Sequence, residues 1–221
     1  YFAPGDKNLV FTVRGFRFGL TICEDMWRED GPLPALIRKG KIQVAININA
    51  SPYHRGKWKE REALIRKWAL LGKIPFCYVN MVGGQDELVF DGHSIMMDGK
   101  GRVVAYGKQF EEDLVIYDVD PKVKVEMPRP HVTFPSDAEI YSALVLGTRD
   151  YIRKNGFQKV VIGLSGGIDS ALVACIAVDA LGKENVVGVS LPSHITSTQS
   201  RDDAKELAGN LGIDFREIAI R

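Results

Sequence analysis

The sequence predicts an α/β protein built from two successive parts. Over residues 1–119, strand-like apolar stretches predominate and helical patterns lie between them. Four prolines, from Pro121 to Pro135, then interrupt the pattern. From residue 137 onward, helical stretches alternate with buried-strand stretches, which is typical of a parallel sheet covered by helices. We therefore expect domains at residues 1–127 and 138–221, joined by a linker over residues 128–137.

The overall composition excludes several classes of protein. The 221 residues contain 29 Lys and Arg against 28 Asp and Glu, a formal net charge of +1, so nothing indicates nucleic-acid binding. No apolar run approaches the roughly 20 residues that span a bilayer, so we expect no membrane partner. Three widely spaced cysteines form neither a disulfide framework nor a zinc pattern. We expect a cytoplasmic protein and, because the sequence lacks a starting Met and ends in a strand-like pattern, a fragment of a longer chain.

The elements of the first part follow from their hydrophobic periodicity. Two strands flank the turn Arg14-Gly15, and a charged helix with apolar residues at helical spacing occupies residues 57–71. The predicted strands are 9–13, 16–22, 42–48, 76–81 and 114–119, with a hairpin-like succession over 83–106 and a short helix at 32–38.

After the prolines, the hydrophobic periodicity of the sequence changes to that of alternating helices and strands. The predicted helices are 137–154, 169–181 and 198–211, and the predicted strands are 159–164, 186–191 and 215–220, the first of them buried. Ser197 or Thr198 is placed to cap the last helix through its hydroxyl.

The stretch GLTICEDMW places Cys23 at the end of a strand, directly before Glu24 and Asp25. Adjacent carboxylates repel a thiolate and raise the pKa of a thiol, so these two acids do not activate it. Two interpretations remain. Cys23 is either a nucleophile whose activating groups lie elsewhere or a small buried hydrophobic residue, and residue type alone favours the second.

The stretch KVVIGLSGGIDSALVA carries the sharpest chemical signal. Between a strand and a helix, the glycines let backbone N–H groups point outward, and two serine hydroxyls with the helix N-terminus complete an anion site. The loop is no Walker A motif, because no Lys follows its glycines. Asp169 either stabilises the helix dipole or holds Mg²⁺ against phosphate oxygens. The alternative is an ordinary capped strand-to-helix turn.

These stretches resemble known families in combination. The loop S-G-G-x-D-S resembles that of N-type ATP pyrophosphatases, and LPSHITSTQSRDDAKELA resembles the matching segment of NAD⁺ synthetases. The stretches GLTICEDMW, NASPYHRGKW and YVNMVGGQDELVFDGHS resemble the nitrilase-like glutaminase domain of glutamine-dependent NAD⁺ synthetases. The resemblance covers nearly the whole chain. It implies the C-terminal part of a nitrilase-like α-β-β-α sandwich followed by the start of a Rossmann-like, parallel-sheet ATP pyrophosphatase domain.

The resemblance also assigns roles to residues. It implies that Cys23 is the glutaminase nucleophile and that Ser51 and Lys57 hold glutamine, whose α-carboxylate suits a hydroxyl and an ammonium. It implies that Asp169 holds Mg²⁺. The implied ATP site consists of Gly163, Leu164, Ser165, Gly166, Gly167, Ile168, Asp169 and Ser170.

The implied reaction is the ATP-driven amidation of deamido-NAD⁺ through an acyl-adenylate, with ammonia from glutamine. The family's catalytic Glu and Lys match segments before Tyr1, and we expect a homo-oligomer. Two alternatives stay open. One is another glutamine-fed ATP pyrophosphatase amidotransferase, because residues beyond Arg221 would select the acceptor. The other is an inert module that binds ATP or glutamine, because the catalytic triad is incomplete here.

Overall fold

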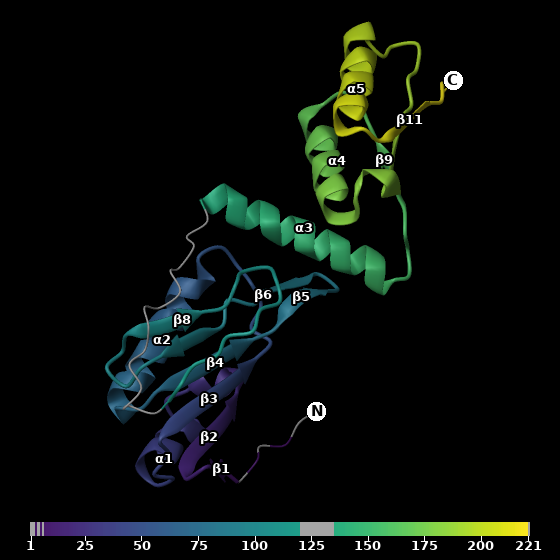
Figure 1. The fold of residues 1–221 in the computed structure, drawn as a ribbon. Helices are drawn as coiled ribbons and strands as arrows, with labels where there is room; N and C mark the ends of the chain where they lie inside the picture. Colours follow the sequence, from purple (N-terminus) through teal and green to yellow (C-terminus); the bar gives the residue numbers. More distant parts are fainter. Residues whose placement is uncertain (1–2, 4, 6, 120–134, 221) are drawn as a thin grey trace. The chain divides into compact units, whose positions relative to one another are not determined.

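The computed structural model describes residues 3, 5, 7–119 and 135–220, and their contacts divide the chain into two units (Figure 1). Unit 1 consists of the described residues of Tyr1–Gly83 and Phe90–Pro135. Unit 2 consists of those of Gly84–Val89 and Ser136–Arg221. Each unit has its own buried apolar cluster.

Unit 1 is built on a six-stranded mixed sheet with the order β1-β2-β3-β4-β7-β8. Strands β2, β3 and β4 are parallel, and the other pairs are antiparallel. The turn between β1 and β2 has positive φ at Arg14 and Gly15, as a tight hairpin requires. The strands are β1 (Leu9–Val13), β2 (Phe16–Ile22), β3 (Val44–Asn49), β4 (Phe76–Asn80), β7 (Ile95–Met97) and β8 (Val103–Tyr106), and β5 (Val82–Gln85) pairs with β6 (Leu88–Asp91) separately.

Helices α1 (Pro32–Arg38) and α2 (Lys57–Gly72) contribute to the core of unit 1, together with the 3-10 helix Cys23–Met26. Ile65 and Trp68 of α2 are buried against Phe76 of β4 in one cluster. The predicted helix at 57–71 is therefore present, although its periodicity placed Leu71 on the buried face and this side chain is 58% exposed.

Part of the opposite face of the sheet is apolar and exposed in the described structure. Ile22, Ile48 and Val79 are register partners on neighbouring strands, and their exposed fractions are 61%, 42% and 49%. An α-β-β-α sandwich covers this face of each sheet with a second sheet, so the exposed row suits the predicted architecture.

The strand predicted at residues 114–119 is wrong. The segment is not part of any strand, and Leu114 and Ile116 are 74% and 82% exposed. Its alternate residues Val115, Tyr117 and Val119 line a cavity over the sheet face instead. Apolar alternation therefore does not require strand pairing here, because the alternate side chains contact a sheet face instead.

Unit 2 contains a three-stranded parallel sheet with the order β11-β10-β9. Its strands are β9 (Val160–Gly163), β10 (Val186–Ser190) and β11 (Asp214–Glu217), and its helices are α3 (Ser136–Lys154), α4 (Ile168–Leu181) and α5 (Thr198–Leu211), with a 3-10 turn at Lys183–Asn185. The prediction that the first strand is buried is wrong. In the described sheet β9 is an edge strand, and Val161 is 71% exposed.

The tip of the β5–β6 hairpin belongs to unit 2. The backbone N–H of Gly84 donates to Asp150 Oδ2 at 2.8 Å, and Lys154 Nζ donates to the Gly84 carbonyl at 2.5 Å, both residues lying on α3. Of the predicted linker, residues 128–134 lie outside the described residues, and Ser136 begins α3. Within the described part of the chain, no helix combines the length and the apolar character needed to cross a bilayer.

Trp68 provides a test of how α2 supports the turn after β2. Its Nε1 donates to the Met26 carbonyl at 2.7 Å, and both residues are buried. We expect Trp68→Phe to lower the free energy of unfolding by about 1–3 kcal/mol, because a buried carbonyl loses its donor. Chemical denaturation measures this loss, and hydrogen exchange should report faster opening at residues 23–27. Leu71→Ala on the same helix is the control, with an expected change of about 0.5 kcal/mol or less. Equal losses in both variants would contradict the role of the hydrogen bond.

Candidate active sites

The parallel pairing of β2, β3 and β4 defines the first candidate site. Ile22 pairs with Ile48, and Ile48 pairs with Val79, so the carboxyl ends of the three strands lie at one edge of the sheet. Cys23 follows β2 directly, and Ser51 follows β3 after one intervening residue. Ligands of such sheets bind beyond the carboxyl ends of the strands, so two of the predicted glutaminase residues lie where a site is expected.

Cys23 occupies a strained turn. Its φ is +40°, a conformation that costs a non-glycine residue about 1–3 kcal/mol and that occurs preferentially at functional sites. It begins a 3-10 helix, and Asp25 Oδ2 accepts a hydrogen bond from the Ile22 backbone N–H at 2.8 Å. Asp25 therefore closes the turn. This structural role accounts for one of the two acids that follow the cysteine in the sequence.

Lys57 is held next to the same turn. Its Nζ lies 4.3 Å from the centre of the Trp27 ring, and Trp27 directly follows the 3-10 helix that begins at Cys23. Lys57 Nζ also donates to Glu60 Oε2 at 2.8 Å, and this hydrogen bond lowers the pKa of Glu60. The structure thus places all three predicted glutaminase residues around one end of the sheet.

Ser51 is buried, with 4% of its surface exposed, and its backbone N–H donates to Asn80 Oδ1 at 3.0 Å. Tyr78 of β4, which the sequence analysis did not single out, is also buried, with 1% of its surface exposed. Burial raises the pKa of Tyr78 to about 12, with Arg61 and Ser51 lowering it and Asp91 and Cys23 raising it further.

A row of buried polar side chains forms the floor beneath this edge, and the sequence analysis missed it. Asn47 Nδ2 donates to Thr21 Oγ1 at 2.9 Å, and Asn49 Nδ2 donates to the Asn47 carbonyl at 2.8 Å. Asn47 Oδ1 and Asn49 Oδ1 are buried and have no hydrogen-bond partner among the described residues. An unpaired buried acceptor is costly, so these two oxygens make the edge near Cys23 and Ser51 unusually polar for a sheet interior. The only sequence signal was polar residues at inward positions of a strand, in the stretch ININAS.

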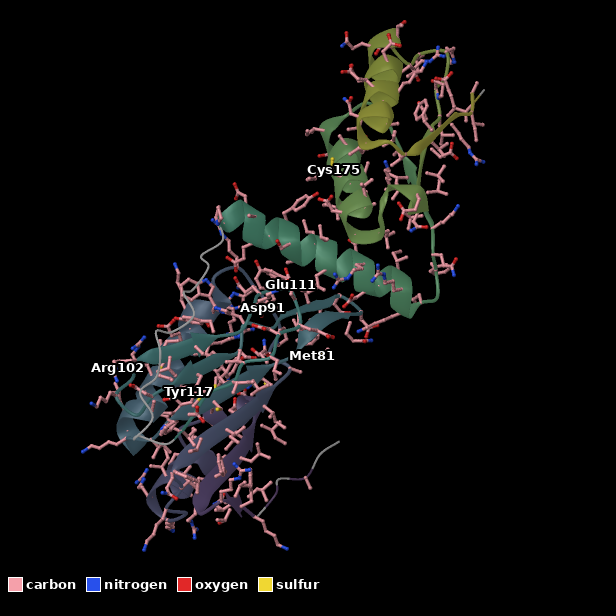
Figure 2. All side chains as sticks on the ribbon, viewed as in Figure 1. Met81, Asp91, Arg102, Glu111, Tyr117 and Cys175 are labelled. Carbon is pink, nitrogen blue, oxygen red and sulfur yellow. The ribbon has the colours of Figure 1, made fainter. Side chains whose placement is uncertain are left out.

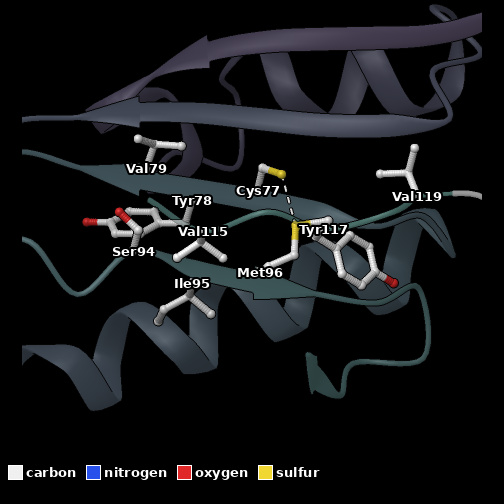
Figure 3. A pocket seen from close by; sticks show the side chains of 9 residues that line it. All are labelled: Cys77, Tyr78, Val79, Ser94, Ile95, Met96, Val115, Tyr117 and Val119. Carbon is white, nitrogen blue, oxygen red and sulfur yellow. Dashed lines mark hydrogen bonds between the residues drawn. The ribbon is translucent and has the colours of Figure 1, made fainter. Parts of the chain in front are cut away.

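Cys77 lies inside a strand, unlike Cys23, which begins a turn. It lies within β4 and contacts a small apolar cavity of about 180 Å³, where its Sγ donates to Met96 Sδ at 2.9 Å (Figure 3). Burial raises the pKa of Cys77 to about 11, which keeps the thiol protonated near neutral pH. Cys77 is therefore a structural thiol, as its position inside a strand suggested.

The second candidate site is the glycine-rich loop between β9 and α4 in unit 2. Ser165 Oγ and Ser170 Oγ are 3.1 Å apart, and Ser165 Oγ accepts from the Gly167 backbone N–H at 3.3 Å, so the loop is closed by its own hydroxyls. Gly167 occupies the N-cap of α4 and offers no side chain to the first helical amides. These amides and the positive helix end are therefore available to an anion.

Gly166 brings the loop against the start of α5. Its φ is +82°, and a Cβ added there would lie 2.3 Å from the Ser200 carbonyl oxygen. Only glycine fits this position, because a side chain would meet both backbone strain and a backbone atom. Ser197 caps α5, its Oγ accepting from the Ser200 backbone N–H at 3.1 Å, so the predicted cap is confirmed.

An open cleft of about 630 Å³ lies at the carboxyl ends of β9 and β10. Three of the predicted ATP residues, Gly163, Leu164 and Ser165, line it. Residues 189–193, 195–197 and 200, which follow β10 or begin α5, supply the rest of the lining. The cleft is therefore adjacent to the anion-binding end of α4 and is large enough for a nucleotide.

Asp169 is exposed in the first turn of α4, next to the loop. The described residues contain no group of three or more His, Cys, Asp or Glu side chains placed to share a metal ion. Mg²⁺ in nucleotide sites commonly takes one or two carboxylates and completes its shell with phosphate oxygens and water, so a single Asp at this position fits the predicted ion.

Comparison with known protein families shows to which class of protein the chain belongs. Residues 1–129 match the carbon-nitrogen hydrolase family, and residues 140–221 match the NAD synthase family. The chain belongs to the carbon-nitrogen hydrolase family and continues into the start of an NAD synthase domain, as the sequence analysis predicted.

Similar proteins match this chain over both of its parts. The glutamine-dependent NAD(+) synthetases of Aquifex aeolicus and Thermotoga maritima are 43% and 42% identical to the whole of this chain. The chain spans 44% of the length of each of these relatives. The structure of glutamine-dependent NAD⁺ synthetase from Acinetobacter baumannii, in complex with ADP, superimposes with a TM-score of 0.91 at 41% identity over the full chain and 42% of that structure. The predicted resemblance is thereby confirmed.

Gly166 provides a test of the second site. We expect Gly166→Ala to weaken ATP binding strongly, because the new Cβ forces the loop away from Ser200, and to destabilise unit 2 by about 1–3 kcal/mol. Calorimetric titration with ATP and thermal unfolding measure the two effects. Gly209→Ala in α5 is the matched control, since nothing lies within 4 Å of its added Cβ and its φ is not positive. Retained ATP affinity in Gly166→Ala would show that the loop does not form the nucleotide site.

Proposed function

We propose that this chain is the central part of a glutamine-dependent NAD⁺ synthetase and that it carries the glutaminase nucleophile and the ATP-binding loop. The observation that supports this best is the succession of two sites in one chain. A cysteine in a strained turn at the strand ends of unit 1 is followed by the Ser-Gly-Gly-Ile-Asp-Ser loop of unit 2. The identity to glutamine-dependent NAD(+) synthetases extends over both.

In the first reaction, the thiolate of Cys23 attacks the side-chain amide carbon of glutamine. The carbon–nitrogen bond breaks, ammonia leaves with a proton from a general acid, and a γ-glutamyl thioester remains until water hydrolyses it to glutamate. Ser51 and Lys57 hold the amino-acid end of the substrate, and Lys57 binds the α-carboxylate of glutamine. The general acid–base pair, Glu and Lys in this family, is supplied by segments outside this chain.

In the second reaction, the carboxylate of deamido-NAD⁺ attacks the α-phosphorus of ATP and pyrophosphate leaves. Ammonia then attacks the resulting acyl-adenylate, and AMP leaves as the amide forms. The loop amides and the hydroxyls of Ser165 and Ser170 bind the phosphates. Asp169 would hold Mg²⁺, which would supply positive charge to neutralise the departing pyrophosphate. The similar Acinetobacter baumannii protein was solved in complex with ADP, which supports nucleotide binding as part of the proposed function.

A second candidate function keeps both sites and changes the acceptor to another carboxylate or carbonyl. The residues that line the described cleft are loop serines, Thr196 and small apolar side chains, which suit phosphates and a sugar without selecting an acceptor. A direct assay of the full-length protein with deamido-NAD⁺, ATP and glutamine distinguishes the two. Absence of NAD⁺ formation with intact ATP cleavage would favour the second candidate.

The glutaminase assignment is tested with Cys23→Ala in the full-length protein. We expect synthesis from glutamine to be lost, because no thiol remains to form the thioester, while synthesis from added ammonium chloride continues at the wild-type rate. Following NAD⁺ formation with each nitrogen source measures both. Cys175→Ala, a half-buried cysteine on α4, is the control and should keep both activities. Loss of both activities in Cys23→Ala would identify a structural cysteine instead.

The role of Asp169 is tested with Asp169→Asn. The amide removes the charge that would hold Mg²⁺ and keeps the side chain's shape, so we expect equal losses of about 100-fold or more with glutamine and with ammonia, from loss of electrostatic stabilisation. The Mg²⁺ concentration that gives half the maximal rate should rise. Unchanged ATP turnover, or a loss with glutamine alone, would rule out the metal role.

A further inference from the structure

Arg61 is the most unexpected side chain in unit 1. It lies on α2 among charged residues, Lys59, Glu60 and Glu62, and the helical pattern predicts a solvated position. Its side chain is nevertheless fully buried, at 0% exposure. Burying a guanidinium is costly unless every donor is paired, so its contacts indicate why it is there.

The contacts of Arg61 converge on the segment that carries Ser51. Nη2 donates to the carbonyl oxygens of Ser51 and Pro52, at 2.8 and 3.2 Å, and Nε donates to Ser51 Oγ at 3.3 Å. Nη1 forms an ion pair with Asp91 Oδ1 at 2.7 Å. The planar fork of one arginine thereby binds two backbone carbonyls, a hydroxyl and a carboxylate at once, which a lysine cannot do.

Asp91 fixes the other side of this arrangement. It ends β6, is 1% exposed, and is labelled in Figure 2. Asn80 completes the connection, since its Nδ2 donates to the Gly92 carbonyl at 3.0 Å while its Oδ1 accepts from the Ser51 N–H. A surface pair such as Arg102–Asp98, whose arginine side chain is 71% exposed, contributes little. The buried pair, in contrast, ties three segments together at fixed geometry.

We propose that Arg61, paired with Asp91, is a positioning residue for the glutamine subsite and acts through Ser51. By donating to Ser51 Oγ, Arg61 occupies an acceptor position of the hydroxyl and leaves its hydrogen for a second acceptor on the substrate. By binding the Ser51 and Pro52 carbonyls, it fixes the backbone that carries this hydroxyl. The inference rests on the proposed glutaminase function of the site.

The test uses Arg61→Lys in the full-length enzyme. The lysine keeps a positive charge opposite Asp91 but cannot reach Ser51 Oγ and both carbonyls together. We expect the KM for glutamine to rise by about 100-fold, the size of effect that a displacement of about 1 Å produces, with a smaller change in the glutamine-supported kcat. The ammonia-supported rate should stay at the wild-type value, since it bypasses the subsite.

The matched control is Arg66→Lys on the same helix. Arg66 also pairs with a carboxylate and a backbone carbonyl, but these belong to Glu62 and Gly101, outside the Ser51 segment. It should leave both the KM for glutamine and the ammonia-supported rate unchanged. An equal rise of KM in both variants would show a general effect of the helix and overturn the proposal.

A double-mutant cycle with Ser51→Ala tests whether Arg61 acts through Ser51. If it does, Arg61→Lys combined with Ser51→Ala is no worse than the more damaging single variant. Multiplicative effects would mean that Arg61 acts independently of Ser51 and would overturn the proposal. A normal glutamine KM in Ser51→Ala would instead contradict the assignment of the subsite. If Cys23→Ala kept synthesis from glutamine, that result would contradict the glutaminase function itself.

Should Arg61→Lys fail to fold, the pair is replaced by Arg61→Met with Asp91→Leu. Replacing a buried ion pair by apolar residues of similar volume is often neutral for stability, whereas removing one partner is not. Folding is checked by thermal unfolding and by the ammonia-supported rate. This double variant should still show the raised KM for glutamine, and a wild-type KM in the folded double variant would overturn the positioning role.

Discussion

The parallel pairing of β2, β3 and β4 is the constraint on which the first site depends. It brings the carboxyl ends of three strands to one edge, so that the turn at Cys23 and the segment at Ser51 become neighbours although 28 positions separate them in the sequence. The strain at Cys23 is tolerable because the ladder on both sides of β2, and the hydrogen bond from Ile22 N to Asp25, determine where the chain must turn.

Helix α2 serves the core and the site at the same time. Its apolar side contributes Ile65 and Trp68 to the core, and Trp68 also holds the Met26 carbonyl in the turn after Cys23. Its first turns carry Lys57 and Arg61. Lys57 lies over the Trp27 ring, and Arg61 donates to the Ser51 carbonyl. A single rigid element thereby sets the spacing between the thiol's turn and the residues proposed to hold the substrate, a geometry that loops alone would hold less well.

The two units use the same physical principle with different chemistry. In each, side chains and backbone amides gather at the carboxyl ends of parallel strands. Unit 1 buries polar groups there, with Asn47 and Arg61 fully enclosed, which suits a small polar substrate held at several points. Unit 2 instead keeps its loop largely exposed and uses the amides at the start of α4 and the close approach of Gly166 to Ser200, which suits the phosphates of a larger ligand.

The sequence by itself determined the order of nearly all helices and strands, the two-part organisation and the loop at residues 165–170. Periodicity and turn residues are local signals, and the composite motifs led to the family. Only the tertiary structure decided that Arg61 is buried, that Asn47 and Ser51 are buried at the edge that carries Cys23, and that residues 115, 117 and 119 line a cavity on a sheet face without strand pairing. A charge on a helix, or an apolar alternation, has several possible partners, and the partner is chosen by contacts between segments far apart in the sequence.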